Sequence, residues 1–173
     1  LHEELKPTRA ERVAHREQYL DLLRSPVPAT VSFAMKALVE VEKAGELDVV
    51  AALEQLGAAL EARDKGTAER ALSILGKAAH AVGNDSEKAR IATVAARALA
   101  HESADVQALA LGLVGDRAAA LNTYAAVLAP SVRARLGTTA EERETTVAAP
   151  PLQMERVVPV VDVGELAELF AAV

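Results

Sequence analysis

A pattern of apolar positions typical of an α-helix occurs three times along the chain. The copies begin at Val31, Ala68 and Val106, so they are separated by 37 and 38 residues. In each copy apolar residues occupy positions i, i+3, i+4 and i+7, which lie along one side of a helix. These positions are Val31, Ala34, Met35 and Leu38; Ala68, Ala71, Leu72 and Leu75; and Val106, Leu109, Ala110 and Leu113. A two-helix repeat of this length predicts a stack of helix pairs rather than a closed domain around an active site.

Turn-forming residues divide the chain into further helices. Pro26 and Pro28 interrupt a helix, Gly45 suits a helix C-terminus, and Gly137 is expected to end the last short helix. Gly57 is small enough to let a neighbouring helix approach closely. The predicted helices span residues 11–23, 28–44, 47–62, 67–82, 87–100, 103–115, 117–128 and 130–136, with Thr67, and Ser86 or Asp85, as N-caps. The predicted fold is all-α: an α-solenoid of about three antiparallel helix pairs with a capping helix.

The C-terminal part of the chain has a different composition. Residues 138–161 combine a polar run with three prolines, which predicts a linker or an extended tail. Asp162 and Glu165 resemble the capping box of a short helix over residues 163–172. The apolar stripe of that helix, which needs a groove to cover it, is Leu166, Leu169 and Phe170. We therefore predict a helical-repeat domain over 1–137, a linker over 138–161, and over 162–173 a short helix or the start of a following domain. Because the chain begins without methionine, we expect it to be a segment of a longer protein.

The composition supports closely packed helices and a reducing compartment. Hydrophobic residues make up 51% of the 173 residues but aromatic residues only 2%, which disfavours a β-sandwich or barrel. The chain has no cysteine and no visible signal peptide, so we expect it to be cytoplasmic. Its longest uncharged stretch, 118–132, is too short and too polar to span a membrane. Of the net charge of −6, residues 140–173 contribute −5 (seven acids and two arginines), so neither part offers a basic surface for nucleic acid.

No residue pattern predicts catalysis or cofactor binding. The four histidines do not form a His-Glu-x-x-His motif, and no glycine-rich phosphate loop or nucleophile motif is present. His80 lies near a helix C-terminus and His101 at a helix corner, where a surface or capping role is expected. Carboxylate pairs such as Glu40 and Glu42 are typical of a solvated helix face, not of a pocket that separates two pKa values. We therefore predict no catalytic residue, no cofactor and no metal.

The third copy of the repeat resembles a known family. Residues 103–113, with Asp105 and Val106 followed by an Ala/Leu ladder, resemble the second helix of a HEAT repeat of the armadillo-like type. Residues 22–38 also look like an uncharacterised family of long cytosolic proteins from high-GC bacteria. The resemblance covers roughly residues 10–136 and concerns packing motifs, which indicate architecture rather than function. It implies binding of other macromolecules along a concave face formed by the second helices.

Aligning the three copies gives two columns of residues away from the apolar stripe. One column is Ser32, Glu69 and Gln107, and the other is Lys36, Ser73 and Leu111. These six positions are the candidate concave binding ridge, although every amphipathic helix has a polar face of this kind. The sequence thus favours a non-enzymatic scaffold that binds a protein partner, in an oligomeric state that the sequence leaves open. The alternatives are a structural spacer in a larger bacterial protein and a HEAT-like module for DNA binding or repair. The DNA-binding alternative is disfavoured because Lys36 is the only base in the columns.

Overall fold

The computed structural model describes residues 7–115 and 123–141, and every regular element in these two ranges is helical. The α-helices are α2 (Arg9–Ala14), α3 (Arg16–Leu22), α4 (Pro28–Lys43), α5 (Leu53–Leu60), α6 (Lys65–Ala81), α7 (Asp85–Ala95), α8 (Ala104–Val114) and α10 (Pro130–Glu141), with a 3₁₀-helix η1 (Ala96–Ala100) after α7. The predicted all-α class is confirmed. The predicted tail and C-terminal helix, from residue 142 onward, lie outside the described residues.

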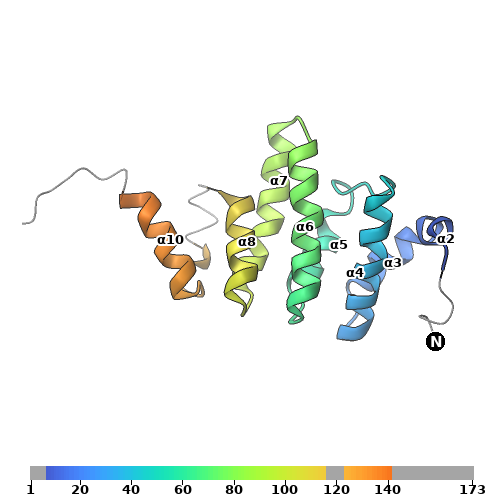
Figure 1. Cartoon of the computed structure of the whole chain (residues 1–173), viewed down its shortest axis with the longest axis horizontal. Coiled ribbons are helices and arrows are strands. Elements are labelled where there is room, and N and C mark those ends of the chain that lie inside the picture. The colour runs from blue at the N-terminus through green and yellow to red at the C-terminus, as the bar shows by residue number, and fades with distance from the viewer. Residues whose placement is uncertain (1–6, 116–122, 142–173) are drawn as a thin grey trace, which may run out of the picture.

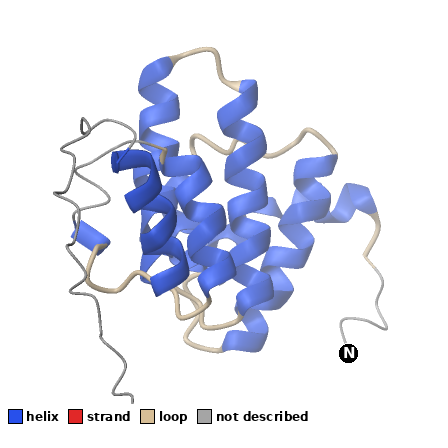
Figure 2. Ribbon diagram, turned by 60° about the vertical axis from the view of Figure 1, so that its left-hand side comes forward, coloured by secondary structure: helices blue, strands red, loops and turns tan. Residues whose placement is uncertain are grey.

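The three copies of the repeat form neighbouring helices. Copies one, two and three lie in α4, α6 and α8, which stand side by side in Figure 1. Contacts join α4 to α6 and α6 to α8, while α5, α7 and η1 pack against these helices from the other side. The turned view in Figure 2 shows the same close spacing of the helices. At one end of the row α2 and α3 contact α4, and at the other end α10 contacts α8.

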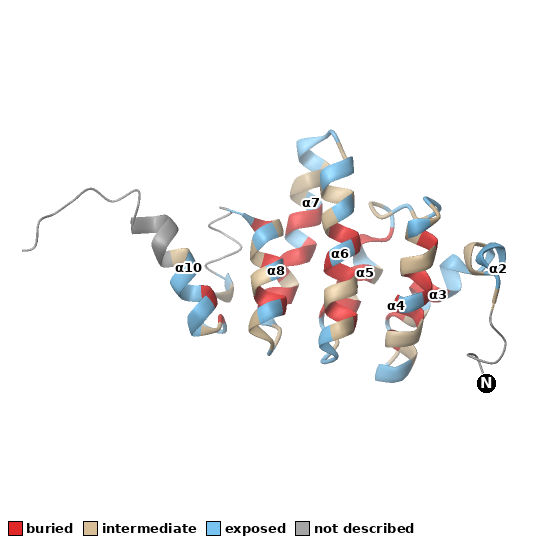
Figure 3. Cartoon of the chain, viewed as in Figure 1, coloured by how far each residue is buried: buried red, intermediate tan, exposed pale blue. Residues whose placement is uncertain are grey.

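Two of the three apolar stripes are buried as the pattern predicts. Val31 is 5% exposed and Ala34, Met35 and Leu38 are fully buried, and in α6 no stripe residue is more than 3% exposed. In α8, however, Leu109 is 50% exposed, so its predicted burial is wrong. The buried positions of α8 are Val106, Gln107, Ala110 and Val114. Figure 3 shows the buried residues of α4, α6 and α8 on the sides that face the neighbouring helices.

The helix termini show which candidate caps the chain uses. Helix α6 begins at Lys65 because the Asp64 carboxylate accepts a hydrogen bond from the Thr67 N–H at 2.9 Å. Thr67, the predicted cap, is instead fully buried within the helix. Asn84 caps α7, not Asp85 or Ser86, by accepting a hydrogen bond from the Ser86 N–H. Gly45 follows α4 with φ of 75°, a conformation that favours glycine and ends the helix as predicted.

Several predicted helix bounds need correction. The predicted helix over 11–23 is two helices, α2 and α3, that meet at His15, whose backbone (φ −103°, ψ 17°) is not helical. The helix predicted from residue 47 begins only at Leu53, because the Asp48 side chain accepts a hydrogen bond from the Ala51 N–H in a preceding turn. Gly137 does not end α10, since one glycine weakens a helix but does not stop it. Of the predicted 117–128 helix, residues 117–122 lie outside the described residues, and the described remainder is helical only at Thr123 and Tyr124 before a turn.

Gly57 permits the close approach that its size predicts. A Cβ atom at this position would lie 2.7 Å from Nη1 of Arg97 and 3.2 Å from Cγ1 of Val94. The absence of a side chain therefore allows α7 and η1 to pack tightly against α5. The Arg97 guanidinium that lies over Gly57 also pairs with Glu54 of α5, with an N–O distance of 3.1 Å.

Candidate interaction surface

The six predicted ridge residues differ in their solvent exposure. Lys36 and Ser73 are exposed, and Ser32, Glu69 and Leu111 are partly exposed. They lie on three helices that contact one another in sequence, α4 to α6 and α6 to α8. Gln107 does not belong to this surface, because only 2% of it is exposed. Its predicted exposure is wrong, so the ridge lacks a polar position on α8.

The side chain of Gln107 is buried because it hydrogen bonds to three backbone groups. Its Nε2 donates hydrogen bonds to the carbonyl oxygens of His101 at 2.8 Å and Val127 at 3.2 Å. Its Oε1 accepts a hydrogen bond from the Ala129 N–H at 2.7 Å. Ala129 directly precedes α10, so this amide fixes the segment that leads into α10 against α8. The sequence signal for this role is weak, since it consists of a single glutamine in an otherwise apolar helix.

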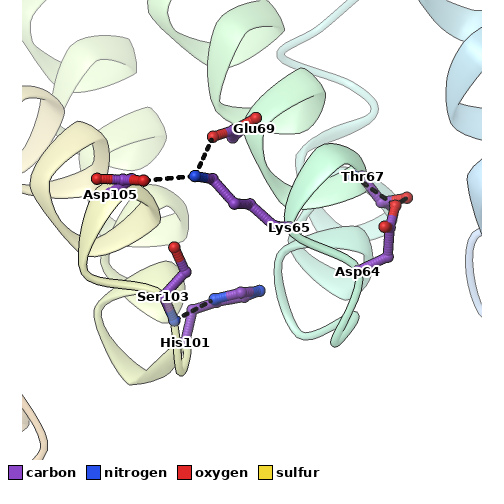
Figure 4. A network of polar contacts seen from close by, with 7 residues as sticks. All are labelled: Asp64, Lys65, Thr67, Glu69, His101, Ser103 and Asp105. Carbon is purple, nitrogen blue, oxygen red and sulfur yellow. Dashed lines mark hydrogen bonds and ion pairs between the residues drawn. The ribbon is translucent and has the colours of Figure 1, made fainter.

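Ion pairs connect the neighbouring helices of the row. Glu42 of α4 pairs with Lys77 of α6 at 2.7 Å. The Lys65 ammonium of α6 hydrogen bonds to Asp105 of α8 and lies 3.6 Å from Glu69 on its own helix (Figure 4). Each junction between row helices thus has a cross-helix pair near the surface. Such exposed pairs contribute little to stability but favour one alignment of the two helices.

The pKa values around Lys65 follow from this geometry. The hydrogen bond to Asp105 raises the pKa of the Lys65 ammonium, and the charge of Asp105 acts in the same direction. The same hydrogen bond lowers the pKa of the Asp105 carboxyl, so the two shifts agree. Near the start of α6, the hydrogen bond from the Thr67 hydroxyl lowers the pKa of Asp64. All three groups are therefore charged at neutral pH, as an ion pair and a helix cap require.

His101 acts at a helix corner, close to the role expected from its position. Its Nδ1 accepts a hydrogen bond from the Ser103 N–H at 2.9 Å (Figure 4), so the neutral ring carries its proton on Nε2. Nε2 is buried and has no hydrogen-bond partner among the described residues. Because solvent does not reach Nε2, a ligand in the neighbouring surface hollow cannot contact this atom. The arrangement explains the shape of the turn before α8 rather than a binding site.

In the surface hollow beside α3, the charged side chains are all exposed to solvent. This hollow of about 560 Å³ lies between α3 and the connection from α4 to α5. Its charged residues, Arg16, Glu17, Glu46 and Asp48, are all exposed and of both signs. A carboxylate pair that works as acid and base needs burial to separate its two pKa values. Within residues 7–115 and 123–141, no group of three or more His, Asp or Glu side chains is placed to hold a metal ion.

Comparisons with family models, curated proteins and solved structures found no match for this chain. Among the described helices, none has the length and apolar character needed to cross a bilayer.

Proposed function

We propose that the chain is a non-enzymatic helical-repeat scaffold that binds a protein partner along the exposed side of α4, α6 and α8. The observation that carries this proposal is the repeated use of one helix pattern in three helices that lie side by side. The finer architecture we propose is a HEAT-like α-solenoid, in which α4, α6 and α8 are the second helices of successive antiparallel pairs. Such a stack presents a long continuous surface, which proteins of this architecture use to bind macromolecules.

Packing within the row supports a repeat architecture. The second stripe position is alanine in the first two copies, Ala34 and Ala71, and in the third copy alanine follows one position later as Ala110; all three alanines are fully buried. Small residues at these positions let helix axes approach closely, and the cross-helix ion pairs Glu42–Lys77 and Lys65–Asp105 align neighbouring helices. Each repeat depends on its neighbours to cover its apolar side, so the exposed surface is held in one shape.

The charges of the row favour a protein partner over nucleic acid. Of the four lysines on α4 and α6, three pair with carboxylates: Lys43 with Glu40, Lys65 with Asp105 and Lys77 with Glu42. Lys36 of α4 and Arg70 of α6 are the cations of these two helices without a recorded ion pair among the described residues. A surface that binds the phosphate backbone needs several cations free to replace condensed counterions. The pairing therefore disfavours the DNA-binding alternative, and duplex binding at micromolar concentration in low salt would contradict this reasoning.

Site-specific photo-crosslinking in the host cell tests the proposed surface. A photoreactive amino acid at Lys36 or Ser73, both exposed on the row, should crosslink a discrete protein partner. Arg90, which is exposed on α7 in the other layer, is the matched control position. The proposal predicts a band of the same mass from the two row positions and none from position 90. Equal crosslinking at all three positions, or none at any of them, would count against a partner-binding row.

A further inference from the structure

The surface of α8 has no polar side chain along most of its length. From residue 106 to residue 115 the only polar side chain is Gln107, and it is buried. Within α8 itself, the residues of this stretch that reach the surface are Ala108, Leu109, Leu111, Gly112 and Leu113, which we call the α8 apolar face. Half of Leu109 is exposed. A helix that is apolar all round is normally covered on every side, so this face is expected to have an occupant.

The other helices of the row lack such a face. The stripe residues aligned with Leu109 are Ala34 in α4 and Ala71 in α6, and both are fully buried. The exposed positions of those helices include Lys36, Ser73 and Lys77, which water solvates readily. The α8 apolar face is therefore a local feature of the third repeat and not a general property of the row.

The α8 apolar face is also open to a second helix. Around Gly112, no atom other than those of its chain neighbours and of the nearby backbone of α8 lies within 4 Å of the place where a Cβ would stand. On the neighbouring α6, Gly76 has no side chain and Leu113 of α8 lies over it, with Cδ2 3.4 Å from the Cβ position. Gly76 is therefore covered, whereas Gly112 is the point at which apolar side chains of an incoming helix can approach the α8 backbone.

We propose that residues 162–173 of this same chain dock on the α8 apolar face as an amphipathic helix. This segment lies outside the described residues, and its sequence places Leu166, Leu169 and Phe170 at i, i+3 and i+4. These three positions form a stripe about one turn long, and Leu109 and Leu113 of α8 are likewise one turn apart. The capping-box pattern of Asp162 and Glu165 favours a helix start just before the stripe.

The connecting chain is long enough for this contact. Helix α10 contacts α8 and is 12 residues, or about 18 Å, long, so the connection begins within about one helix length of the contact with α8. The 20 residues from 142 to 161 span at most ~66–72 Å, whereas an 11-residue helix such as α8 is about 16 Å long. A tether of this kind gives an effective concentration on the order of millimolar, so a weak contact suffices. Free proteins at micromolar concentration would need a far higher affinity to compete.

Charge indicates which part of the face is covered. At the lower end of α8 in Figure 4, Asp105 and Glu69 surround the single cation Lys65, which leaves a net negative charge. The segment itself contributes Asp162, Glu165 and Glu168. Like charges repel, so the docked segment should lie toward Gly115 and leave Asp105 uncovered. Leu109, Gly112 and Leu113 are the expected contact residues.

Disulfide trapping in the 173-residue chain tests this proposal directly, because the chain has no cysteine of its own. Gly112→Cys places a thiol at an open point of the face, and Ala167→Cys places one beside the stripe without altering it. The control pair is Arg90→Cys with Ala167→Cys, since Arg90 is exposed on α7. Both double variants have the same tether, so chain length does not differ between them, and the stripe substitutions given below separate docking from the different positions of residues 90 and 112.

The proposal predicts that the 112/167 pair forms an intramolecular disulfide at least about tenfold faster than the 90/167 pair. Adding Leu166→Asp and Leu169→Asp to the 112/167 variant should return its rate to that of the control. Circular dichroism verifies that each variant retains its helices. Equal rates for the two pairs would overturn the proposal. Predominantly intermolecular disulfides from the 112/167 variant would also overturn it, because the occupant would then be a second copy of the chain.

Discussion

Replacement of Gln107 by leucine should destabilise the end of the row next to α10. Leucine has a similar volume but cannot hydrogen bond to the His101 and Val127 carbonyls or to the Ala129 N–H. A buried polar group that loses its partner costs ~1–3 kcal/mol, and groups that regain water cost less. All three bonds are only partly buried, and the new leucine gains some apolar burial. We therefore expect a net loss of about 2 kcal/mol in the free energy of unfolding.

The location of the effect distinguishes this reasoning from a general loss of packing. The amide holds the backbone at Val127 and Ala129, directly before α10. Hydrogen exchange should therefore accelerate most in residues 123–136, and much less in α4 and α6. Urea unfolding gives the change in free energy, and exchange measured by mass spectrometry gives its location. A loss below about 0.5 kcal/mol with unchanged exchange in residues 123–136 would refute the role assigned to this side chain.

Gln55 provides a matched control within the same chain. Its Oε1 is buried but has no hydrogen-bond partner among the described residues. Gln55→Leu makes the same chemical change as Gln107→Leu but removes an unpaired acceptor, so stability should stay the same or rise. Equal losses from both substitutions would show that the three bonds of Gln107 are not the cause.

Three further predictions concern packing, helix geometry and pH. Leu38→Ala should lower the free energy of unfolding by about 2–5 kcal/mol, measured by denaturant titration, because this side chain is fully buried. Gly57→Val should lower the free energy of unfolding by about 1–3 kcal/mol, because the new valine side chain meets Val94 and Arg97. Gly112→Ala has open space for its methyl group and should raise the free energy of unfolding by up to about 1 kcal/mol. Thermal melts that rank the two variants in the opposite order would contradict this. Asp64→Ala should cost about 1 kcal/mol at neutral pH through the lost cap. The pKa of Asp64 in the folded state lies below its ordinary value of 3.8, so the stabilisation from this carboxylate is present above pH 3.8 and is lost as the pH falls through the lower, folded-state pKa. In acid titrations, the difference in free energy of unfolding between wild type and Asp64→Ala should therefore shrink.

Hydrophobic periodicity predicted the orientation of α4 and α6 because those helices have distinct polar and apolar sides. Around Lys36 in α4 and Ser73 in α6, polar residues mark the exposed side, so only one rotation buries the stripe. In α8 the hydrophobic periodicity does not predict the orientation of the helix, because nearly every residue is apolar and several rotations bury a similar area. The prediction of the six-residue ridge is wrong at Gln107 for this reason, since it requires the same helix rotation in all three copies.

Helix ends were predictable only to within a few residues, for a related reason. Asp64 and Thr67 are both good N-cap residues, and the sequence places them three positions apart. The structure selects Asp64 because Thr67 is fully buried, where its hydroxyl donates to the Asp64 carboxylate at 2.6 Å. Similarly, Asp48 delays the start of α5 through a hydrogen bond to the Ala51 N–H. Such choices depend on burial by other helices, which local patterns do not contain.

The buried amide of Gln107 and the exposed side chain of Leu109 are two results of one rotation of α8. Residues two positions apart in a helix differ by about 200°, so burying one of them turns the other toward the surface. Burying Leu109 instead would gain about 1.5–3 kcal/mol, but it would leave three backbone groups without the partners that Gln107 supplies, at ~1–3 kcal/mol each. The stabilisation from the three hydrogen bonds of Gln107 is thus larger than the gain from burying Leu109.

It follows that Gln107→Leu removes the reason for this rotation. In that variant leucine stands at both position 107 and position 109, so a rotation that buries Leu109 and exposes residue 107 can compete with the present one, and the α8 apolar face should present Leu109 for only part of the time. We expect the 112/167 disulfide to form more slowly in the Gln107→Leu background, although residue 107 lies on the side of α8 opposite Leu109. An unchanged rate, in a variant that has lost the stability calculated above, would show that the orientation of α8 does not depend on its buried amide.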